Sequence, residues 1–197
     1  KGRIKDFYIN DILQTIWYAD YLGLNLKGID SSSMIGQAKF FNNKGKLSTI
    51  KNYVSGTQEG DDIYYYEESG GIKKITDYLN GKPNGKELWY YESGEIMADR
   101  EFLNGKLNGE FKRYNKSGEI KEINAFIDGF LEGRSEGFKN GKLNYTVDYK
   151  KGLINGDQVF YYESGIIKGK IPYVNNLKSG SEISYFETGE VNTIRNY

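Results

Sequence analysis

Glycine recurs along the sequence with a period of about 24 residues, and this repeat constrains the fold more than any other feature of the chain. Successive members of the first glycine column are separated by 24, 25, 24, 24, 23 and 24 residues. A unit of this length is one small structural element that must stack against its neighbours to bury an apolar face. The repeats begin near the following residues: Gly36, Gly60, Gly85, Gly109, Gly133, Gly156 and Gly180.

Two aromatic columns fix the same register. The sixth residue of every repeat is aromatic, although aromatic residues make up only 15% of the chain. We expect this column to form a structural aromatic ladder that holds neighbouring strands in register. Its members are Phe41, Tyr65, Tyr90, Tyr114, Phe138, Tyr161 and Tyr185. The second column follows a second glycine by eight residues and comprises Tyr53, Tyr78, Phe102, Phe126, Tyr149, Tyr173 and Tyr197.

Each repeat divides into two extended segments that Gly or Asn residues bound. The segment 85–94 is too short for a helix and is rich in strand-forming residues. The Asn-Gly and Ser-Gly linkers supply the positive φ angles that tight hairpin turns require, and Asn176 replaces glycine in the last of these turns. The sequence therefore predicts an all-β fold, a single elongated, twisted antiparallel sheet of tandem β-hairpins.

The repeats also predict the domain organisation. Residues 36–197 form seven tandem repeats, and residues 1–35 are expected to contain degenerate N-terminal repeats. The pair Trp17-Tyr18 lies 72 residues, or three periods, before Trp89-Tyr90. The strand that ends at Tyr197 is expected to leave an unpaired edge, which favours edge-to-edge self-association.

Composition excludes several classes of function. The chain contains no His and no Cys, so zinc sites built on imidazole or thiolate and His-based or Cys-based catalysis are excluded. The 27 basic and 27 acidic residues balance to a formal net charge of +0, which gives no reason to expect nucleic acid as a partner. No apolar run is long enough for a transmembrane segment. We expect no cofactor and no metal.

Alternation along the strands separates two faces of the predicted sheet. The fourth and sixth positions of a repeat share one face, and the fifth and seventh share the other. The fifth and seventh columns are aromatic in some repeats and polar in others, which favours a partner-binding surface. The aromatic rings could instead cover the second face of a thin sheet, or stack on sugars. The candidate partner-binding residues are Tyr64, Tyr66, Trp89, Tyr91, Phe160 and Tyr162.

Acidic residues cluster before the second glycine of several repeats, as at Glu92 and Glu163. Paired carboxylates could in principle hydrolyse glycosides, but a catalytic pair would be unique rather than a repeated column. The densest acidic segment, Asp61-Asp62 followed by Glu67-Glu68, lacks the spacing of a calcium loop and is interpreted as a solvated turn. We therefore expect no catalytic residues and no enzymatic activity.

The spacing aromatic-x-Asn-Gly-Lys-x-x-Gly, followed by a further aromatic residue and a further Gly, resembles the bacterial variant of the MORN repeat. The resemblance covers residues 36–197 and extends weakly to the rest. Over its full length the chain is similar to the YwqK-like antitoxins of toxin–antitoxin systems. This resemblance implies an antiparallel hairpin sheet and a binding role, with no catalytic residues to transfer.

Together these observations predict a non-enzymatic protein-binding repeat module. The resemblance implies an antitoxin or immunity-type protein that sequesters a partner, such as a cognate toxin. The alternative is a secreted or surface-anchored scaffold or adhesion-type protein that binds envelope or host components. The sequence begins at Lys1 rather than Met. It leaves the compartment open, because an antitoxin would be cytoplasmic and a leader before Lys1 would direct the protein to the envelope or outside the cell.

Overall fold

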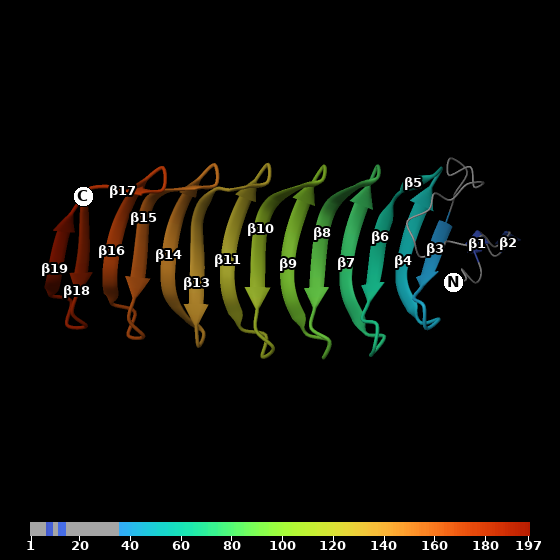
Figure 1. Cartoon of the computed structure of the whole chain (residues 1–197), viewed down its shortest axis with the longest axis horizontal. Helices are drawn as coiled ribbons and strands as arrows, with labels where there is room; N and C mark the ends of the chain where they lie inside the picture. Colours follow the sequence, from blue (N-terminus) through green and yellow to red (C-terminus); the bar gives the residue numbers. More distant parts are fainter. Residues whose placement is uncertain (1–6, 10–11, 15–35) are drawn as a thin grey trace. The chain divides into compact units, whose positions relative to one another are not determined.

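The computed structural model describes residues 7–9, 12–14 and 36–197, and no helix occurs among them. The chain divides into two compact units, and Figure 1 labels the strands. Unit 1 comprises residues 1–96 and 102–105, and unit 2 comprises residues 97–101 and 106–197. Strand β9 (Ile96–Leu103) contributes residues to both.

Unit 1 is an antiparallel sheet of consecutive hairpins. At its N-terminal side, β1 pairs with β2 and, through Tyr8 opposite Gln37, with β3. Trp17-Tyr18, which are expected to belong to a degenerate repeat, lie outside the described residues, so the boundary at residue 35 stays a prediction. Its strands are β1 (Phe7–Ile9), β2 (Ile12–Gln14), β3 (Gly36–Phe41), β4 (Leu47–Val54), β5 (Thr57–Gln58), β6 (Gly60–Tyr65), β7 (Ile72–Leu79) and β8 (Lys82–Tyr90).

Unit 2 is also an antiparallel sheet of consecutive hairpins, in which strands that follow one another along the chain pair with each other. Strand β19 is exposed at all six of its residues. Its strands are β10 (Lys106–Tyr114), β11 (Ile120–Ile127), β12 (Phe130–Leu131), β13 (Gly133–Lys139), β14 (Lys142–Lys150), β15 (Leu153–Tyr161), β16 (Ile167–Val174), β17 (Leu177–Lys178), β18 (Ser181–Tyr185) and β19 (Val191–Asn196).

The predicted all-β fold of tandem antiparallel hairpins is confirmed, and the hairpin turns form as expected. In the turn between β7 and β8, Asn80 and Gly81 have φ angles of 52° and 73°, which matches the right-handed twist of the flanking strands. Asn176 takes the glycine position of the last such turn with a φ of 69°. Asparagine therefore replaces glycine where the sequence pattern predicts it.

The first glycine column differs from the turns because several of its members lie inside strands. Gly85 lies within β8 at a register irregularity opposite β7, with a φ of 109°. A Cβ atom at Gly85 would lie 2.7 Å from Oδ2 of Asp77, and the same oxygen accepts a 2.9 Å hydrogen bond from the Lys86 backbone amide. This column therefore forms β-bulges, where a side chain on the neighbouring strand needs close access to the backbone.

A second bulge follows the fifth position of the repeats. Tyr64 is opposite Lys74, but Tyr65 is opposite Ile72, so β7 carries one extra residue. The same shift recurs at the equivalent positions of other hairpins. Each sixth-position ring for which the pairing is resolved therefore lies opposite an aliphatic residue of the returning strand. The predicted ladder therefore consists of aromatic–aliphatic cross-strand pairs, which stabilise a sheet as pairs of aromatic residues do.

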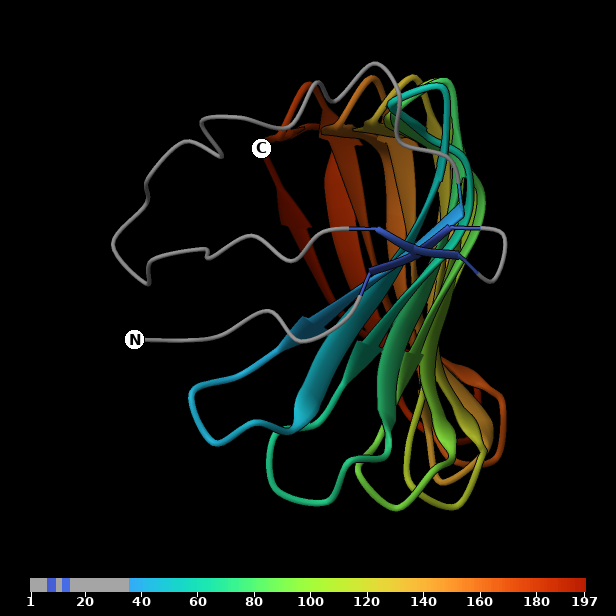
Figure 2. The same ribbon diagram turned by 90° about the vertical axis from the view of Figure 1, so that its right-hand side faces the viewer.

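Within each unit the strands bend toward one side, so one face of each sheet is concave (Figure 2). Register and strand alternation place Asp62, Tyr64, Lys74, Glu87 and Trp89 of unit 1 on one face of the sheet. We call this face, and the equivalent face of unit 2, the inner face. Crowding across the curled sheet buries side chains without a covering layer. The buried residues are mostly small or polar and comprise Ala38, Ile50, Asp62, Thr76, Glu87, Ala98, Asn124, Ser135, Thr146 and Val147.

Candidate functional site

Cross-strand pairing brings two predicted binding residues together on the inner face of unit 1. Lys74 of β7 lies between Tyr64 of β6 and Trp89 of β8, because it is the direct cross-strand partner of both. The Lys74 ammonium is 4.2 Å from the centroid of the Tyr64 ring and 5.3 Å from that of Trp89. Both distances are within the range of a cation–π contact.

Glu87 holds this lysine from the other side. Its Oε2 atom lies 3.4 Å from Nζ of Lys74 and accepts a 2.8 Å hydrogen bond from the Thr76 hydroxyl. Its Oε1 atom accepts a 2.6 Å hydrogen bond from the Trp89 indole. Glu87 is only 4% exposed. The buried carboxylate is therefore compensated by one cation and two hydrogen bonds, as a buried charge requires.

Asp62 is a second buried carboxylate on the same face, with 0% exposure. Its Oδ2 atom accepts hydrogen bonds from the Gln58 amide and, at 3.5 Å, from the Tyr64 hydroxyl, and lies 3.9 Å from Nζ of Lys51. Its Oδ1 atom has no hydrogen-bond partner among the residues that the structure describes. Burial raises the pKa of Asp62, although Lys51 and the hydrogen bonds oppose the shift. Burial and the nearby Asp62 charge also raise the pKa of Tyr64.

The seventh-position tyrosines connect neighbouring repeats. The Tyr66 hydroxyl donates a 2.6 Å hydrogen bond to the backbone carbonyl of Tyr90, 24 residues along the chain. The Tyr162 hydroxyl donates a 2.8 Å bond to the carbonyl of Tyr185. Tyr91 occupies the same column and is half-buried. These bonds give Tyr66 and Tyr162 a structural role, and their role as partner anchors stays a prediction.

The inner face of unit 2 has a different composition. Tyr145 covers Gly137 so closely that a Cβ atom there would lie 2.1 Å from the Tyr145 ring. The third predicted aromatic of the fifth column, Phe160, is the cross-strand partner of Tyr145 on one side and of Gly169 on the other. A hollow of about 280 Å³ opens beside Phe160. Residues that line it include Phe160, Gly169, Ile171, Glu182 and Ser184.

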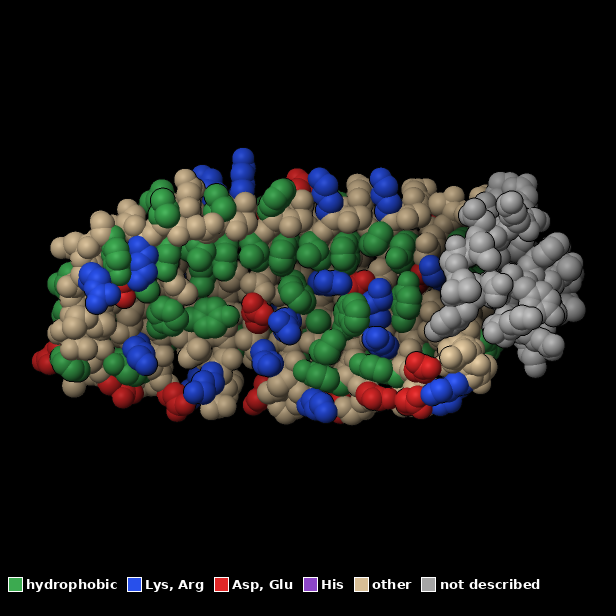
Figure 3. All heavy atoms as spheres, viewed as in Figure 1, with side chains coloured by type: hydrophobic (Ala, Val, Ile, Leu, Met, Phe, Trp, Pro, Cys, Tyr) green, Lys and Arg blue, Asp and Glu red, His purple; other side chains and the backbone are tan. Residues whose placement is uncertain are grey.

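Figure 3 shows large hydrophobic side chains gathered in rows across the strands of both units, with charged side chains between them. Unit 2 also contains a tilted ring pair, Phe111 and Phe126, with centroids 6.2 Å apart. An ion pair joins Arg113 and Glu122 at 3.7 Å. The inner faces therefore combine aromatic side chains, which are enriched at protein interfaces, with charged side chains, of which Lys, Glu and Asp are depleted there.

The acidic segment predicted as a solvated turn forms one only at Glu67-Glu68, which are exposed in the turn after β6, and not at Asp61-Asp62. Asp61 and Asp62 lie on opposite faces of β6, and Asp62 is fully buried. Glu67 and Glu68 follow the strand at a rim hollow of about 450 Å³, where Glu68 forms a 2.7 Å ion pair with Lys44. In the part of the chain that the structure describes, no group of three or more acidic residues is arranged to hold a metal ion.

Sequence reasoning missed the charged part of the site. The sequence pattern does not predict Lys74, Glu87 and Asp62 as binding-site residues, because charged residues in strands usually face solvent. A signal was present, since the third position of a repeat and the fourth residue after the second glycine fall on the same face as the fifth position. Opposite charges at those two positions, as at Glu87 and Lys74, indicate a cross-strand ion pair.

Comparison with known families agrees with this architecture. The family model of the MORN repeat variant matches residues 83–104, 107–128 and 154–175. These three segments are therefore MORN-variant repeats, and the MORN-repeat resemblance drawn from the glycine and aromatic columns is confirmed, while the similarity to YwqK-like antitoxins stays a prediction. Repeats of this kind are generally protein-binding or membrane-binding modules. No curated protein matches the chain. Among the described residues, none forms a helix of the length and apolarity needed to cross a bilayer.

Proposed function

We propose that this chain is a non-enzymatic protein-binding module that presents its inner faces to a protein partner. One observation carries the proposal. The sixth column keeps an aromatic residue in every repeat, whereas the fifth column changes from Tyr64 and Trp89 to Arg113, Gly137 and Phe160. A column with only a structural role would be uniform, so the variation supports recognition of a particular partner.

The physical character of the fifth column supports the same conclusion. Tyr64 and Trp89 are half-buried rings whose orientation is fixed by Lys74 and Glu87. Rigid aromatic anchors contribute much of the affinity of protein interfaces, because little side-chain entropy is lost on binding.

The test compares two double variants whose substitutions lie on opposite faces of the strands. The first carries Trp89→Ser and Phe160→Ser on the inner faces. The control carries Leu79→Ser and Val174→Ser, which alternate to the opposite face of their strands at positions that are 48% and 53% exposed. Partners captured from a native lysate are quantified against the wild-type bait. We expect the inner-face variant to lose specific partners that the control retains. If circular dichroism shows both variants folded and both capture the same partners, the proposal is wrong.

The finer form of the proposal is an antitoxin or immunity-type protein that sequesters a cognate toxin. The similarity of the sequence to YwqK-like antitoxins supports it. The test is co-expression with the product of the neighbouring gene in a bacterial host. Growth that recovers with the wild-type chain, and fails to recover with the inner-face variant, would support sequestration. Unchanged growth together with surface location in cell fractionation would favour the alternative of an envelope or adhesion scaffold.

A further inference from the structure

The hollow of unit 2 occupies the position that Lys74 fills in unit 1. Lys74 and Gly169 are both the fourth residue after the second glycine of their repeats. Each is the cross-strand partner of a fifth-position aromatic ring, Tyr64 for Lys74 and Phe160 for Gly169. The carboxylate is also retained, because Glu87 and Glu182 are both the third residue of the following repeat. Unit 2 therefore keeps the ring and the carboxylate and lacks the lysine between them.

Gly169 has no structural need to be glycine. Its φ angle lies outside the left-handed region, and a Cβ atom would meet only the Ile183 carbonyl oxygen, at 3.4 Å. The same column carries Thr49 and Thr193, so larger residues fit this position of the repeat. Glycine inside a strand destabilises it and often marks a place where another molecule approaches closely.

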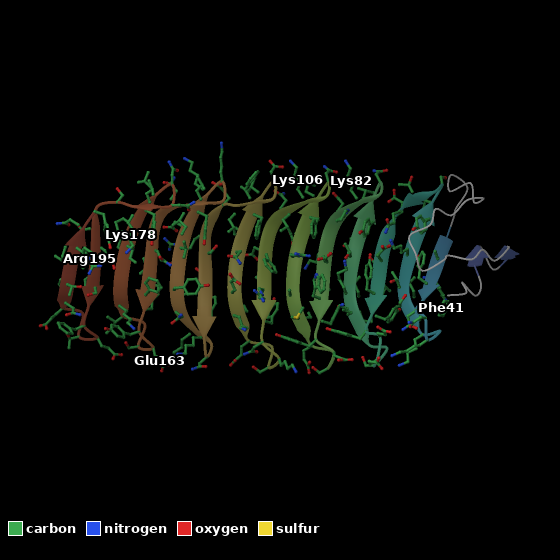
Figure 4. All side chains as sticks on the ribbon, viewed as in Figure 1. Phe41, Lys82, Lys106, Glu163, Lys178 and Arg195 are labelled. Atoms are coloured by element: carbon green, nitrogen blue, oxygen red, sulfur yellow. The ribbon has the colours of Figure 1, made fainter. Side chains whose placement is uncertain are left out.

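The carboxylate of the hollow is ionised and partly available. The Oε2 atom of Glu182 accepts two hydrogen bonds of 2.7 Å, one from the Lys178 ammonium and one from the Tyr197 hydroxyl. Among the described residues no hydrogen bond reaches Oε1. The bonds to Lys178 and Tyr197 lower the pKa of Glu182. Lys178 and Arg195 lie beside Glu182 and compete with an incoming cation (Figure 4). Lys168 and Lys170 also line the hollow, but the ammonium of Lys170 pairs with Asp157 at 2.7 Å and that of Lys168 lies 5.6 Å from the Tyr162 ring centroid.

We propose that the hollow beside Phe160 and Gly169 binds a lysine side chain of the protein partner, in the arrangement that Lys74 adopts within unit 1. The alkyl stem would lie over Gly169, and the ammonium would lie against the Phe160 ring and Glu182. This inference rests on the proposed protein-binding function and specifies the chemistry of one contact. Lys74, held 4.2 Å from the Tyr64 centroid and 3.4 Å from Glu87, shows that a primary ammonium suits this geometry.

The test uses n-butylammonium chloride as the probe and n-butanol as its neutral counterpart. The amide of Gly169 and the methyl groups of Ile171 are followed by NMR in the full chain. We expect saturable shifts with butylammonium, and only weak, non-saturable shifts with butanol. Absence of saturable shifts at these residues, or equal responses to both probes, would overturn the inference.

Four variants connect any binding to the proposed geometry. Gly169→Lys supplies the missing lysine from the chain itself and should abolish saturable binding, and Gly169→Thr fills the hollow without a charge should the lysine variant fail to fold. Phe160→Leu should weaken binding by about threefold or more, through loss of the cation–π contact. Lys178→Gln should strengthen binding by removing a competing cation. Full binding in Gly169→Thr would overturn the inference.

The experiment separates this inference from the function on which it rests. In one outcome, the double variant Trp89→Ser and Phe160→Ser loses its captured partners while the wild-type chain shows no saturable binding of butylammonium. That pair of results would support the protein-binding function and overturn only the lysine contact.

Discussion

The inner faces of the two units are built from the same repeat and differ in what fills them. In unit 1, Lys74 and Glu87 complete a compensated network between two aromatic rings. In unit 2, the equivalent lysine is replaced by Gly169 and a hollow opens. The backbone register is the same in both, because bulges and turns recur at equivalent positions. The comparison shows that the scaffold holds its geometry while the residues that face a partner change.

The largest expected effect comes from removing the buried carboxylate of unit 1. Glu87→Ala should lower the free energy of unfolding by about 3 kcal/mol, because it removes the buried carboxylate that pairs with Lys74 and accepts hydrogen bonds from Thr76 and Trp89. Glu182→Ala is the matched change in unit 2 and should lower it far less, since the Glu182 side chain is 28% exposed and its ion pair is screened by solvent. Urea denaturation measures both, and equal losses would contradict the difference between the units.

Two of the strand glycines of unit 2, Gly137 and Gly169, give the next largest contrast. Gly137→Ala should destabilise the fold by about 2 kcal/mol, because the new Cβ atom collides with the Tyr145 ring. Gly169→Ala should instead stabilise it by about 0.5 kcal/mol, because the new Cβ atom would be at contact distance, 3.4 Å, from the Ile183 carbonyl oxygen without a collision, and the unfolded chain loses conformational freedom. Thermal unfolding of the two variants should shift in opposite directions. A shift of the same sign and size for both would show that the Gly169 site is not open.

The inter-repeat tyrosines should behave alike in the two units. Tyr66→Phe and Tyr162→Phe each remove one hydroxyl bond to a backbone carbonyl and should each cost about 1 kcal/mol. Chemical denaturation of both single variants and of the double variant measures the losses. We expect them to be equal and additive, because the two sites share no contact; a large difference would place Tyr66 or Tyr162 in a role beyond this bond.

The smallest expected effect is a change in the slope of the unfolding free energy against pH, in the range above the unfolded pKa of Asp62. Burial raises the pKa of Asp62 above its unfolded value of about 3.9. The folded state therefore binds this proton more tightly than the unfolded state, and the resulting stability is present below the unfolded pKa. It is lost as the pH rises through the folded pKa. Asp62→Asn should flatten this part of the curve of unfolding free energy against pH, and an unchanged curve would show that Asp62 does not cause it.

Much of the fold was predictable from local sequence. Asn80-Gly81 specifies a hairpin turn by backbone sterics alone, and the aromatic columns at Tyr65 and Tyr90 specify register. The role of Gly85 was not predictable, because a bulge forms only where the carboxylate of Asp77 on the neighbouring strand meets its backbone. Of the predicted binding residues, Tyr64, Trp89 and Phe160 reach the inner faces, while the hydroxyls of Tyr66 and Tyr162 bond to the backbone of the next repeat.

The sequence by itself determined the repeat length, the antiparallel hairpins and the two faces, since these depend on turn sterics and on the two-residue period of a strand. Only the tertiary structure decided which side chains meet across strands. It placed Lys74 between Tyr64 and Trp89, buried Asp62 and left the site at Gly169 open. Such contacts join residues about 10 to 25 positions apart, and their energies depend on burial and distance, which a single strand read alone does not contain.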